Sequence, residues 1–266
     1  MLAGRRALVT GGGRGIGRQV ALDLAKAGVR VAVAARTRAE VDAVAREVEA
    51  LLARDAGARD AGTGAVALTV DVADPASVRA LFTDARAALG GIDILVSAAG
   101  VAPSAPLART TDEQWRQAID VNLSGTFHCL REALPGMVAA GWGRAVNIAS
   151  IAGKTGMPYI AAYAASKHGV LGLTKVAALE VAANGVTVNA VCPGYVDTPM
   201  TDVSIQRMVE KTGRGADEIR RRIADSSPQK RLYTTAEVSA LVLFLCGDDA
   251  AGINGQALSI DGGTVV

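Results

Sequence analysis

Tyr163 and Lys167 are the residues whose types and spacing suggest chemistry most directly. They stand four residues apart in the segment YAASK, so on a helix they share one face, about one turn from each other. A free phenol has a pKa of about 10, and a nearby ammonium group stabilises the phenolate and lowers that pKa. Burial opposes this shift because it penalises both charged forms. The spacing predicts an acid–base pair, and the alternative for so short a motif is a packed tyrosine beside a solvated lysine.

Ser150 and Asn122 are further polar residues that alternating strands and helices can bring near this pair. Ser150 ends an apolar run and stands thirteen residues before Tyr163, where its hydroxyl could orient a substrate carbonyl. Asn122 lies within a helix that the pattern predicts over 111–134, in an apolar setting, and a buried amide requires hydrogen-bond partners. We expect that helix to end at Pro135, because proline removes a backbone donor.

A glycine-rich turn follows the first apolar run, at 7–9, and precedes a helix predicted over 18–27. Glycines let the backbone approach a pyrophosphate closely, and a helix N-terminus offers unpaired N–H groups to an anion. The strict G-x-G-x-x-G spacing is absent, so a flexible glycine-rich loop is the alternative. The predicted phosphate and cofactor contacts are Gly11, Arg14, Gly15, Ile16 and Gly17.

The second apolar run, at 29–35, ends where a dinucleotide fold presents the side chain that contacts the ribose. Ala35 and Arg36 stand there, and neither carries the carboxylate that would bind the 2′-hydroxyl of NAD. Arg36 and Arg14 could instead bind the 2′-phosphate of NADP(H). The sequence therefore favours NADP(H) over NAD(H), and the alternative is that both arginines are ordinary solvated surface charges.

Two more predicted strand ends supply candidate contacts to the cofactor. The runs at 65–70 and 92–96 indicate strands, and ligands bind at the carboxyl ends of open parallel sheets. Asp71 could hold the adenine, and the alternative is a turn or N-cap carboxylate. Asp74 is the better candidate for capping the helix predicted at 75–89. The other candidate contacts at these two ends are Val72, Ala98, Ala99 and Gly100.

Composition argues against several classes of protein. The 266 residues are 50% hydrophobic and only 3% aromatic, with 28 Lys and Arg against 26 Asp and Glu. No basic run is interleaved with aromatic residues, so we expect no nucleic-acid partner. No apolar signal segment or membrane span is visible, so we expect a cytoplasmic protein with no membrane partner. Three widely spaced cysteines without ligand spacing predict no metal site.

The alternation of elements predicts one α/β domain over 1–266. Its core would be a doubly wound Rossmann-type parallel sheet of about seven strands, with helices on both faces. The final strand is expected at 257–260, after a helix at 235–246, and the low-complexity tract at 55–64 indicates an exposed loop.

A charged helical segment at 196–231 is expected to form a lid on the substrate side. Between 207 and 231 it carries eight basic and four acidic residues. The excess of +4 would suit the phosphates of coenzyme A or of a phosphopantetheine-bearing acidic carrier protein. A solvated lid-helix face is the alternative.

Taken together, these residues resemble the short-chain dehydrogenase/reductase family over nearly the whole chain. Three motifs carry the resemblance. The family's T-G-x-x-x-G-x-G turn falls on Thr10, Gly11, Gly15 and Gly17, and its catalytic residues fall on Asn122, Ser150, Tyr163 and Lys167. The family's P-G falls on Pro193 and Gly194, and it is followed by Val196 and Thr198, where the resemblance implies that the nicotinamide amide is held. One departure is that the family's N-N-A-G is Ser97-Ala98-Ala99-Gly100 here, which removes hydrogen bonds that brace the sheet beside the cofactor.

The runs YAASKHGV and NAVCPGYVDTPM are also similar to bacterial polyketide ketoreductases and to 3-hydroxyacyl or 3-hydroxybutyrate dehydrogenases. The resemblance implies NADPH-dependent reduction of a ketone, in first place a 3-oxoacyl thioester on a carrier protein or coenzyme A, or a polyketide β-ketone. In that mechanism NADPH delivers hydride, Tyr163 protonates the oxygen and Ser150 hydrogen-bonds it. Lys167 also binds the nicotinamide ribose, and Asn122 holds a relay water. A homotetramer is implied as well.

Two alternatives to this function remain open, and a third is disfavoured. An oxidative 3-hydroxyacyl-CoA, 3-hydroxybutyrate or hydroxysteroid dehydrogenase is the nearest, and a non-catalytic NADP(H)-binding sensor is more remote. A Ser/His hydrolase is disfavoured because the sequence has no G-x-S-x-G elbow and both His128 and His168 sit in predicted helices.

Overall fold

Short runs of β-branched and small apolar residues form the strands, as their pattern predicts. The computed structural model describes residues 2–54 and 65–265, so the loop predicted at 55–64 lies outside the described residues. Seven strands pair in parallel in the order β3-β2-β1-β4-β5-β6-β7, which confirms the predicted doubly wound sheet. The strands are β1 (Arg6–Thr10), β2 (Arg30–Ala35), β3 (Ala65–Thr69), β4 (Ile94–Ser97), β5 (Gly143–Ile148), β6 (Val186–Pro193) and β7 (Ala257–Ile260).

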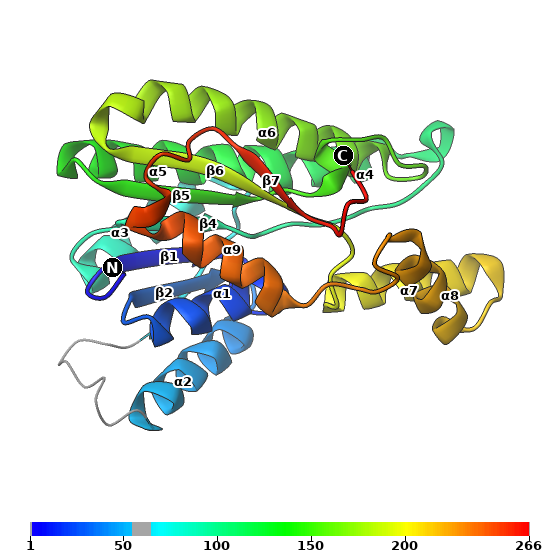
Figure 1. Ribbon diagram of the computed structural model, residues 1–266, viewed down its shortest axis with the longest axis horizontal. Coiled ribbons are helices and arrows are strands. Elements are labelled where there is room, and N and C mark those ends of the chain that lie inside the picture. The colour runs from blue at the N-terminus through cyan, green and yellow to red at the C-terminus, as the bar shows by residue number, and fades with distance from the viewer. Residues whose placement is uncertain (1, 55–64, 266) are drawn as a thin grey trace.

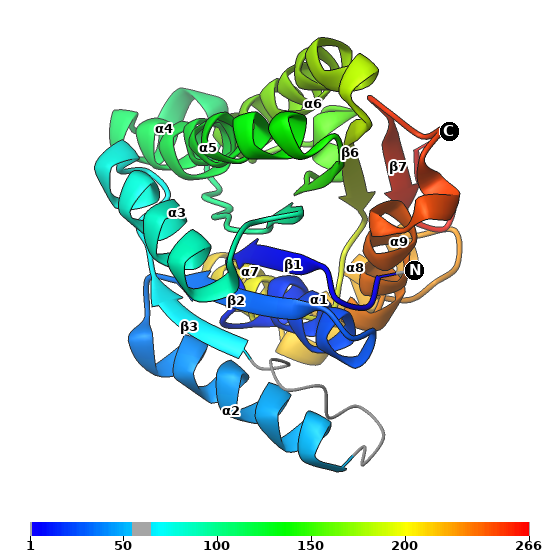
Figure 2. The same ribbon diagram turned by 90° about the vertical axis from the view of Figure 1, so that its left-hand side faces the viewer.

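Helices cover both faces of this sheet (Figure 1, Figure 2). One layer consists of α1 (Gly15–Lys26), α2 (Arg38–Arg54) and α9 (Thr235–Cys246). The opposite layer consists of α3 (Pro75–Leu89), α4 (Asp112–Ala118), α5 (Gly125–Ala140) and α6 (Ala161–Val181). Two more helices, α7 (Pro199–Thr212) and α8 (Ala216–Ser226), project beyond both layers at one end of the molecule (Figure 1).

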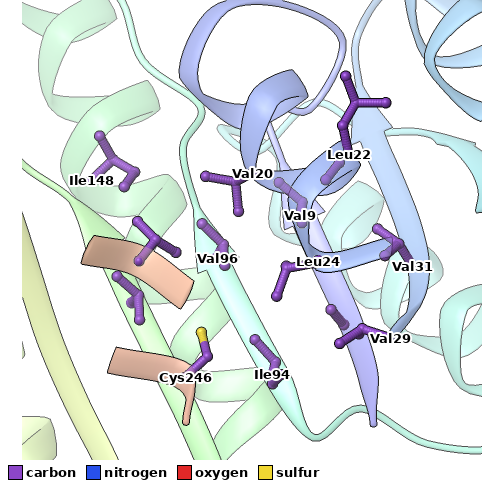
Figure 3. Packing of buried hydrophobic residues seen from close by; sticks show 14 of the residues in the cluster. Val9, Val20, Leu22, Leu24, Val29, Val31, Ile94, Val96, Ile148 and Cys246 are labelled. Carbon is purple, nitrogen blue, oxygen red and sulfur yellow. The ribbon is translucent and has the colours of Figure 1, made fainter. Parts of the chain in front are cut away.

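The core beneath α1 shows how the strands that carry the site are held. Val9, Ile94 and Val96 of the central strands pack against Val20 and Leu24 of α1 (Figure 3). All five side chains have 0% exposure, and full burial of one such side chain stabilises a fold by about 1.5–3 kcal/mol. The ends of β1 and β4 are therefore fixed in position relative to each other.

The segment predicted as one helix over 111–134 differs from that prediction. It comprises α4, a π-helical segment η2 (Ile119–Ser124) and α5, and α5 continues through Pro135. The prediction that Pro135 ends the helix is wrong, because α5 ends only at Gly141, whose φ of +66° suits glycine. Pro135 has no N–H to bond the carbonyl of Arg131, four residues earlier, and the helix continues despite this loss. The neighbouring carbonyl of Glu132 accepts a hydrogen bond from Arg86 of α3.

Smaller boundary differences also bear on the site. The first helix begins at Gly15 and not near Arg18, which brings its N-terminus into the glycine turn. The fifth strand ends at Ile148, so Ser150 lies just beyond the sheet edge. Asp74 caps α3 by accepting a hydrogen bond from the Ala76 nitrogen at 2.9 Å, as predicted.

Candidate active site

The glycine turn between β1 and α1 is shaped by contacts that no side chain could enter. A Cβ on Gly11 would lie 2.5 Å from the Ala99 nitrogen, and one on Gly17 would lie 2.3 Å from the Gly11 oxygen. The φ of Gly11 is +66° and that of Gly15 is +55°, which other residues rarely adopt. The turn thus packs against the end of β4 and leads directly into the N-terminus of α1, where the first N–H groups lack helical partners.

One cleft, with a cavity volume of about 310 Å³, collects the predicted site residues at the carboxyl ends of the strands. Those that line it are Gly11, Arg14, Gly15, Ile16, Gly17, Arg36, Asp71, Val72, Ala98, Ala99, Gly100, Ser150, Tyr163, Lys167, Pro193, Gly194, Val196 and Thr198. Asn122 is the one predicted residue that does not line the cleft. The sequence therefore predicts 18 of the 39 residues that line the cleft, although they come from distant parts of the chain.

Tyr163 and Lys167 lie in the first turns of α6, and the lysine is buried. Its side chain is 5% exposed, and Nζ donates a hydrogen bond of 2.7 Å to the carbonyl oxygen of Ile148. Nζ lies 5.7 Å from the centroid of the Tyr163 ring. The helix thus holds the ammonium beside the phenol, and the predicted pair is present.

The pKa values of both members of this pair are governed mainly by burial. Burial lowers the pKa of Lys167 to about 8. Burial also raises the pKa of Tyr163, although a hydrogen bond with Ser150 works in the opposite direction. Of the two opposing effects that the sequence predicts for the phenol pKa, burial is therefore the larger one here. At neutral pH the phenol carries its proton, and most of the lysine remains charged.

Ser150 stands two residues past β5 in extended backbone and faces this pair. Its Oγ accepts a hydrogen bond from the Ala152 nitrogen at 3.1 Å, which caps the short helix η3 (Ile151–Gly153). That bond fixes the side chain at the cleft wall. The hydroxyl proton is left for another acceptor, because the backbone amide occupies only a lone pair.

Asn122 lies in the π-helical segment η2 and is completely buried. Its Oδ1 accepts from the Val101 nitrogen at 2.8 Å, and its Nδ2 donates to the Val101 oxygen and to Ser166 Oγ, both at 2.9 Å. Ser166 Oγ in turn donates to the carbonyl oxygen of Tyr163 at 2.7 Å. Through these bonds Asn122 ties the segment after β4 to the first turns of α6.

The opposite end of the cleft is exposed and charged. Arg14 and Arg36 are both exposed and both line the cleft, as predicted. Glu40, from the first turn of α2, also lines it, and its Oε1 lies 3.6 Å from Arg14 Nη1. Sequence analysis missed this carboxylate because it considered only the end of β2, and the signal would have been its place in the first turn of the helix that follows.

Asp71 has the predicted turn role and also lines the cleft. It lines the cleft at the end of β3, and its Oδ1 also accepts a hydrogen bond from the Ala73 nitrogen at 3.0 Å, which forms a local turn. The carboxylate is exposed. A turn role and a contact to a ligand are therefore compatible at this position.

The segment after β6 connects the sheet to α7 and α8. Thr198 caps α7, and the α7 residues Met200, Ser204 and Met208 line the cleft. Other apolar side chains that the sequence did not single out are Met157, Ile160 and Tyr195, of which Tyr195 directly follows the Pro-Gly motif.

Part of the basic excess in this segment is neutralised locally. Arg220 pairs with Asp197 at 2.8 Å and with Asp202 at 2.5 Å. Arg207 donates to the carbonyl oxygen of Ala102 at 2.9 Å, which links α7 to the segment after β4. These contacts favour a structural role for several of the basic side chains.

The departure from the family's N-N-A-G pattern leaves a polar row inside the sheet. Ser97 of β4 pairs in register with Asn147 of β5, and both are buried. Among the described residues, Ser97 Oγ and Asn147 Oδ1 have no hydrogen-bond partner. Asn147 Nδ2 donates to Thr174 Oγ1 at 3.0 Å. The hydroxyl at Ser97 therefore does not replace the bracing bonds of an asparagine.

Within residues 2–54 and 65–265, no group of three or more His, Cys, Asp or Glu side chains is placed to hold a metal ion. No helix in the described part of the chain is both long and apolar enough to cross a membrane.

Comparison with known proteins agrees with this geometry. A family model described as short chain dehydrogenase matches residues 5–208. The chain is 39% identical to D-beta-hydroxybutyrate dehydrogenase of Rhizobium meliloti over 261 residues, covering 97% of this chain and 98% of the relative. It is 36% identical to 3-oxoacyl-[acyl-carrier-protein] reductase of Staphylococcus aureus over 260 residues, with 97% of each chain covered.

Among solved structures, a variant of actinorhodin polyketide ketoreductase crystallised with NADPH superposes with a TM-score of 0.91. It is 37% identical, and the match covers 98% of this chain and 97% of the ketoreductase. Levodione reductase also gives a TM-score of 0.91, at 31% identity, with 98% of this chain and 97% of that reductase covered. The protein therefore belongs to the short-chain dehydrogenase/reductase family, as its glycine turn and its Ser150, Tyr163 and Lys167 predict.

Proposed function

We propose that this protein is an NADPH-dependent reductase that converts a ketone into a secondary alcohol. Its preferred substrate is a 3-oxoacyl thioester, bound to a carrier protein or to coenzyme A, or a polyketide β-ketone. The observation that carries the proposal is the convergence of Ser150, Tyr163 and Lys167 in one cleft with the glycine turn. The named activities of the acyl-carrier-protein reductase and of the polyketide ketoreductase support the substrate class.

The cleft fits a dinucleotide along its length. The turn at Gly11 and Gly17 has no space for a Cβ, so its backbone can approach a pyrophosphate. Arg14 and Arg36 would hold a 2′-phosphate, and Asp71 and Val72 would border the adenine. The nicotinamide end would be held by Ala98, Ala99, Gly100, Lys167, Pro193, Gly194, Val196 and Thr198. Bound NADPH supplies the hydride that the carbonyl carbon receives.

In this proposal Tyr163 is the general acid. Its raised pKa keeps the proton on the phenol at neutral pH, ready for the carbonyl oxygen as negative charge develops there. Ser150 donates a second hydrogen bond to that oxygen. The ammonium of Lys167 then stabilises the phenolate that remains after proton transfer, and it supplies a hydrogen-bond donor for the nicotinamide ribose.

Asn122 acts as a positioning residue in this scheme. Its side chain is fully engaged with Val101 and Ser166, so its amide holds α6 and the segment after β4 together. The family resemblance also implies a relay water held by Asn122, whose side-chain amide already bonds Val101 and Ser166. A π-helical turn widens the backbone, and such turns are frequent at functional sites.

The segment at 196–231 would serve as a lid on the substrate side of one domain that spans 1–266. Support comes from Met200, Ser204 and Met208 of α7, which line the cleft. A homotetramer is also part of the proposal, because Trp115, Leu179 and other large apolar side chains are exposed on the α4–α6 layer. Light scattering at the mass of a monomer would contradict the tetramer.

A second candidate is the oxidative direction on a 3-hydroxy acid or its thioester. The 39% identity to D-beta-hydroxybutyrate dehydrogenase favours it specifically. The same residues serve either direction, since a phenolate at Tyr163 would accept the alcohol proton. A sensor without catalysis is disfavoured, because a binding protein has no use for the phenol–ammonium pair of Tyr163 and Lys167.

The test is a substrate screen that follows NADPH absorbance with purified protein. Its panel contains 3-oxoacyl thioesters of coenzyme A and of a carrier protein, a polyketide mimic, ketosteroids and simple ketones. The expected result is the highest kcat/KM with a 3-oxoacyl thioester or the polyketide mimic. Oxidation of 3-hydroxybutyrate with no reduction of any thioester would support the second candidate, and turnover of no carbonyl substrate or alcohol would contradict both.

A further inference from the structure

Glu40 introduces a negative charge at the end of the cleft where the sequence predicts only positive charge. Its carboxylate lines the cleft together with Arg14 and Arg36, and Oε1 lies 3.6 Å from Arg14 Nη1. The side chain of Glu40 is 34% exposed and that of Arg14 is 68% exposed, so the pair is partly open to solvent. Either side chain can therefore exchange its partner for a ligand that enters from the cleft.

The position of Glu40 is constrained by the glycine turn. A Cβ on Gly13 would lie 2.8 Å from Glu40 Cβ and 3.0 Å from its Oε2, so the side chain packs directly over the backbone of the turn. It also stands in the first turn of α2, where the positive end of the helix dipole stabilises a carboxylate. Both contacts keep the negative charge beside Arg14.

We infer that Glu40 opposes the preference for NADPH that Arg14 and Arg36 create. This inference rests on the proposed function, in which the two arginines hold a 2′-phosphate. A phosphate that binds Arg14 lies beside the carboxylate of Glu40, which is 3.6 Å from the same guanidinium, so two negative groups share one small region. NADH has a 2′-hydroxyl in place of the phosphate, so it does not compete for Arg14, and the carboxylate can accept its hydrogen bond.

The experiment measures the Kd of NADPH and of NADH by nicotinamide fluorescence, so it requires no substrate. Glu40→Gln keeps the shape of the side chain and removes its charge. We expect it to strengthen NADPH binding by roughly threefold or more, with NADH binding unchanged or weaker. The gain should shrink as ionic strength rises, because the groups are partly exposed.

Glu47→Gln is the matched control. Glu47 of α2 pairs with Arg18 of α1, so it is a carboxylate on the same helix as Glu40 that also pairs with an arginine. Neither Arg18 nor Glu47 lines the cleft. Glu47→Gln should leave the ratio of the two Kd values unchanged. An equal shift of that ratio in both variants would overturn the inference, because it would show only a general charge effect.

A double variant tests whether Glu40 acts through Arg14. In an Arg14→Gln background, the effect of Glu40→Gln on NADPH binding should fall, since the group for which they compete is gone. The inference would be overturned if Glu40→Gln left the ratio of the two Kd values unchanged, or if its gain in NADPH affinity persisted in full without Arg14. Neither result would contradict the proposed function. If the unmutated protein bound neither dinucleotide, the proposed function itself would fail.

Discussion

The two ends of the cleft hold their functional groups in different ways. At the chemical end Asn122 is 0% exposed and Lys167 is 5% exposed, and hydrogen bonds to backbone atoms fix both. At the adenosine end the side chain of Arg14 is 68% exposed and meets Glu40 at 3.6 Å. Exposed ion pairs contribute about 0–1 kcal/mol, whereas breaking a buried network costs more. Loss of one group at the chemical end should therefore reduce the reaction rate strongly. A change at the adenosine end should shift the preference between NADPH and NADH by a smaller amount.

Tyr163→Phe should produce the largest effect, at the buried end. Phe keeps the ring and its packing but removes the proton donor, so ketone reduction should fall by about 10²–10⁴-fold. The Kd of NADPH, measured by fluorescence titration, should stay nearly unchanged. A variant that retained more than about a tenth of the turnover would show that the phenol has a structural role and would remove the contrast between the two ends.

Ala35→Asp combined with Arg36→Ala tests the exposed end. This double variant adds a carboxylate where NAD-binding folds carry one and removes one arginine, so the ratio of kcat/KM should swing toward NADH. The expected change is about tenfold or more, with kcat for the preferred cofactor largely kept. If the unmutated protein already had a lower KM and a higher kcat with NADH, the argument from Arg14 and Arg36 would be wrong.

Much of the fold and of the site could be predicted from the sequence, because local patterns determine where strands lie and where helices begin. Ser150, Tyr163 and Lys167 meet because α6 follows β5 in the chain and begins at the carboxyl end of that strand. The glycine turn meets the end of β4 because β1 and β4 are neighbouring parallel strands, although they are far apart in the sequence. Three features could not be predicted. Continuation of α5 through Pro135 goes against the usual helix-breaking effect of proline, the presence of Glu40 in the cleft depends on how α2 packs, and the net direction of the Tyr163 pKa shift depends on how far burial outweighs the charges around it.

The pH dependence of stability offers a third test, of the burial of Lys167. The folded protein releases this proton at a pKa of about 8, whereas the unfolded chain holds it up to the ordinary value of 10.5. Between these values the unfolded state binds more protons, so this residue makes the free energy of unfolding rise as pH rises. Urea denaturation at the two ends of this window, at pH about 8 and about 10.5, should show that rise relative to Lys167→Met. An equal pH dependence in the two proteins would show that burial does not lower the pKa of Lys167 in the folded protein.

The smallest expected effect concerns the polar row behind the site. Ser97→Ala removes a buried hydroxyl without a partner among the described residues, so the free energy of unfolding should change by less than about 1 kcal/mol. Ser166→Ala removes a hydroxyl that is bonded to Asn122 and to the Tyr163 carbonyl, so it should lower stability by about 1–3 kcal/mol. Thermal and urea denaturation of the two variants side by side would check this order, and a greater loss at Ser97 would contradict it.

The most direct test of the central claim follows the hydride itself. NADPH carrying deuterium at the transferable position of the nicotinamide is incubated with the protein and a 3-oxoacyl thioester, and the product is analysed by mass spectrometry and NMR. The account predicts one deuterium on the carbinol carbon of the 3-hydroxyacyl thioester for each NADPH consumed, with the hydroxyl proton drawn from solvent through Tyr163. Consumption of NADPH without deuterium at that carbon, or formation of no alcohol, would contradict it.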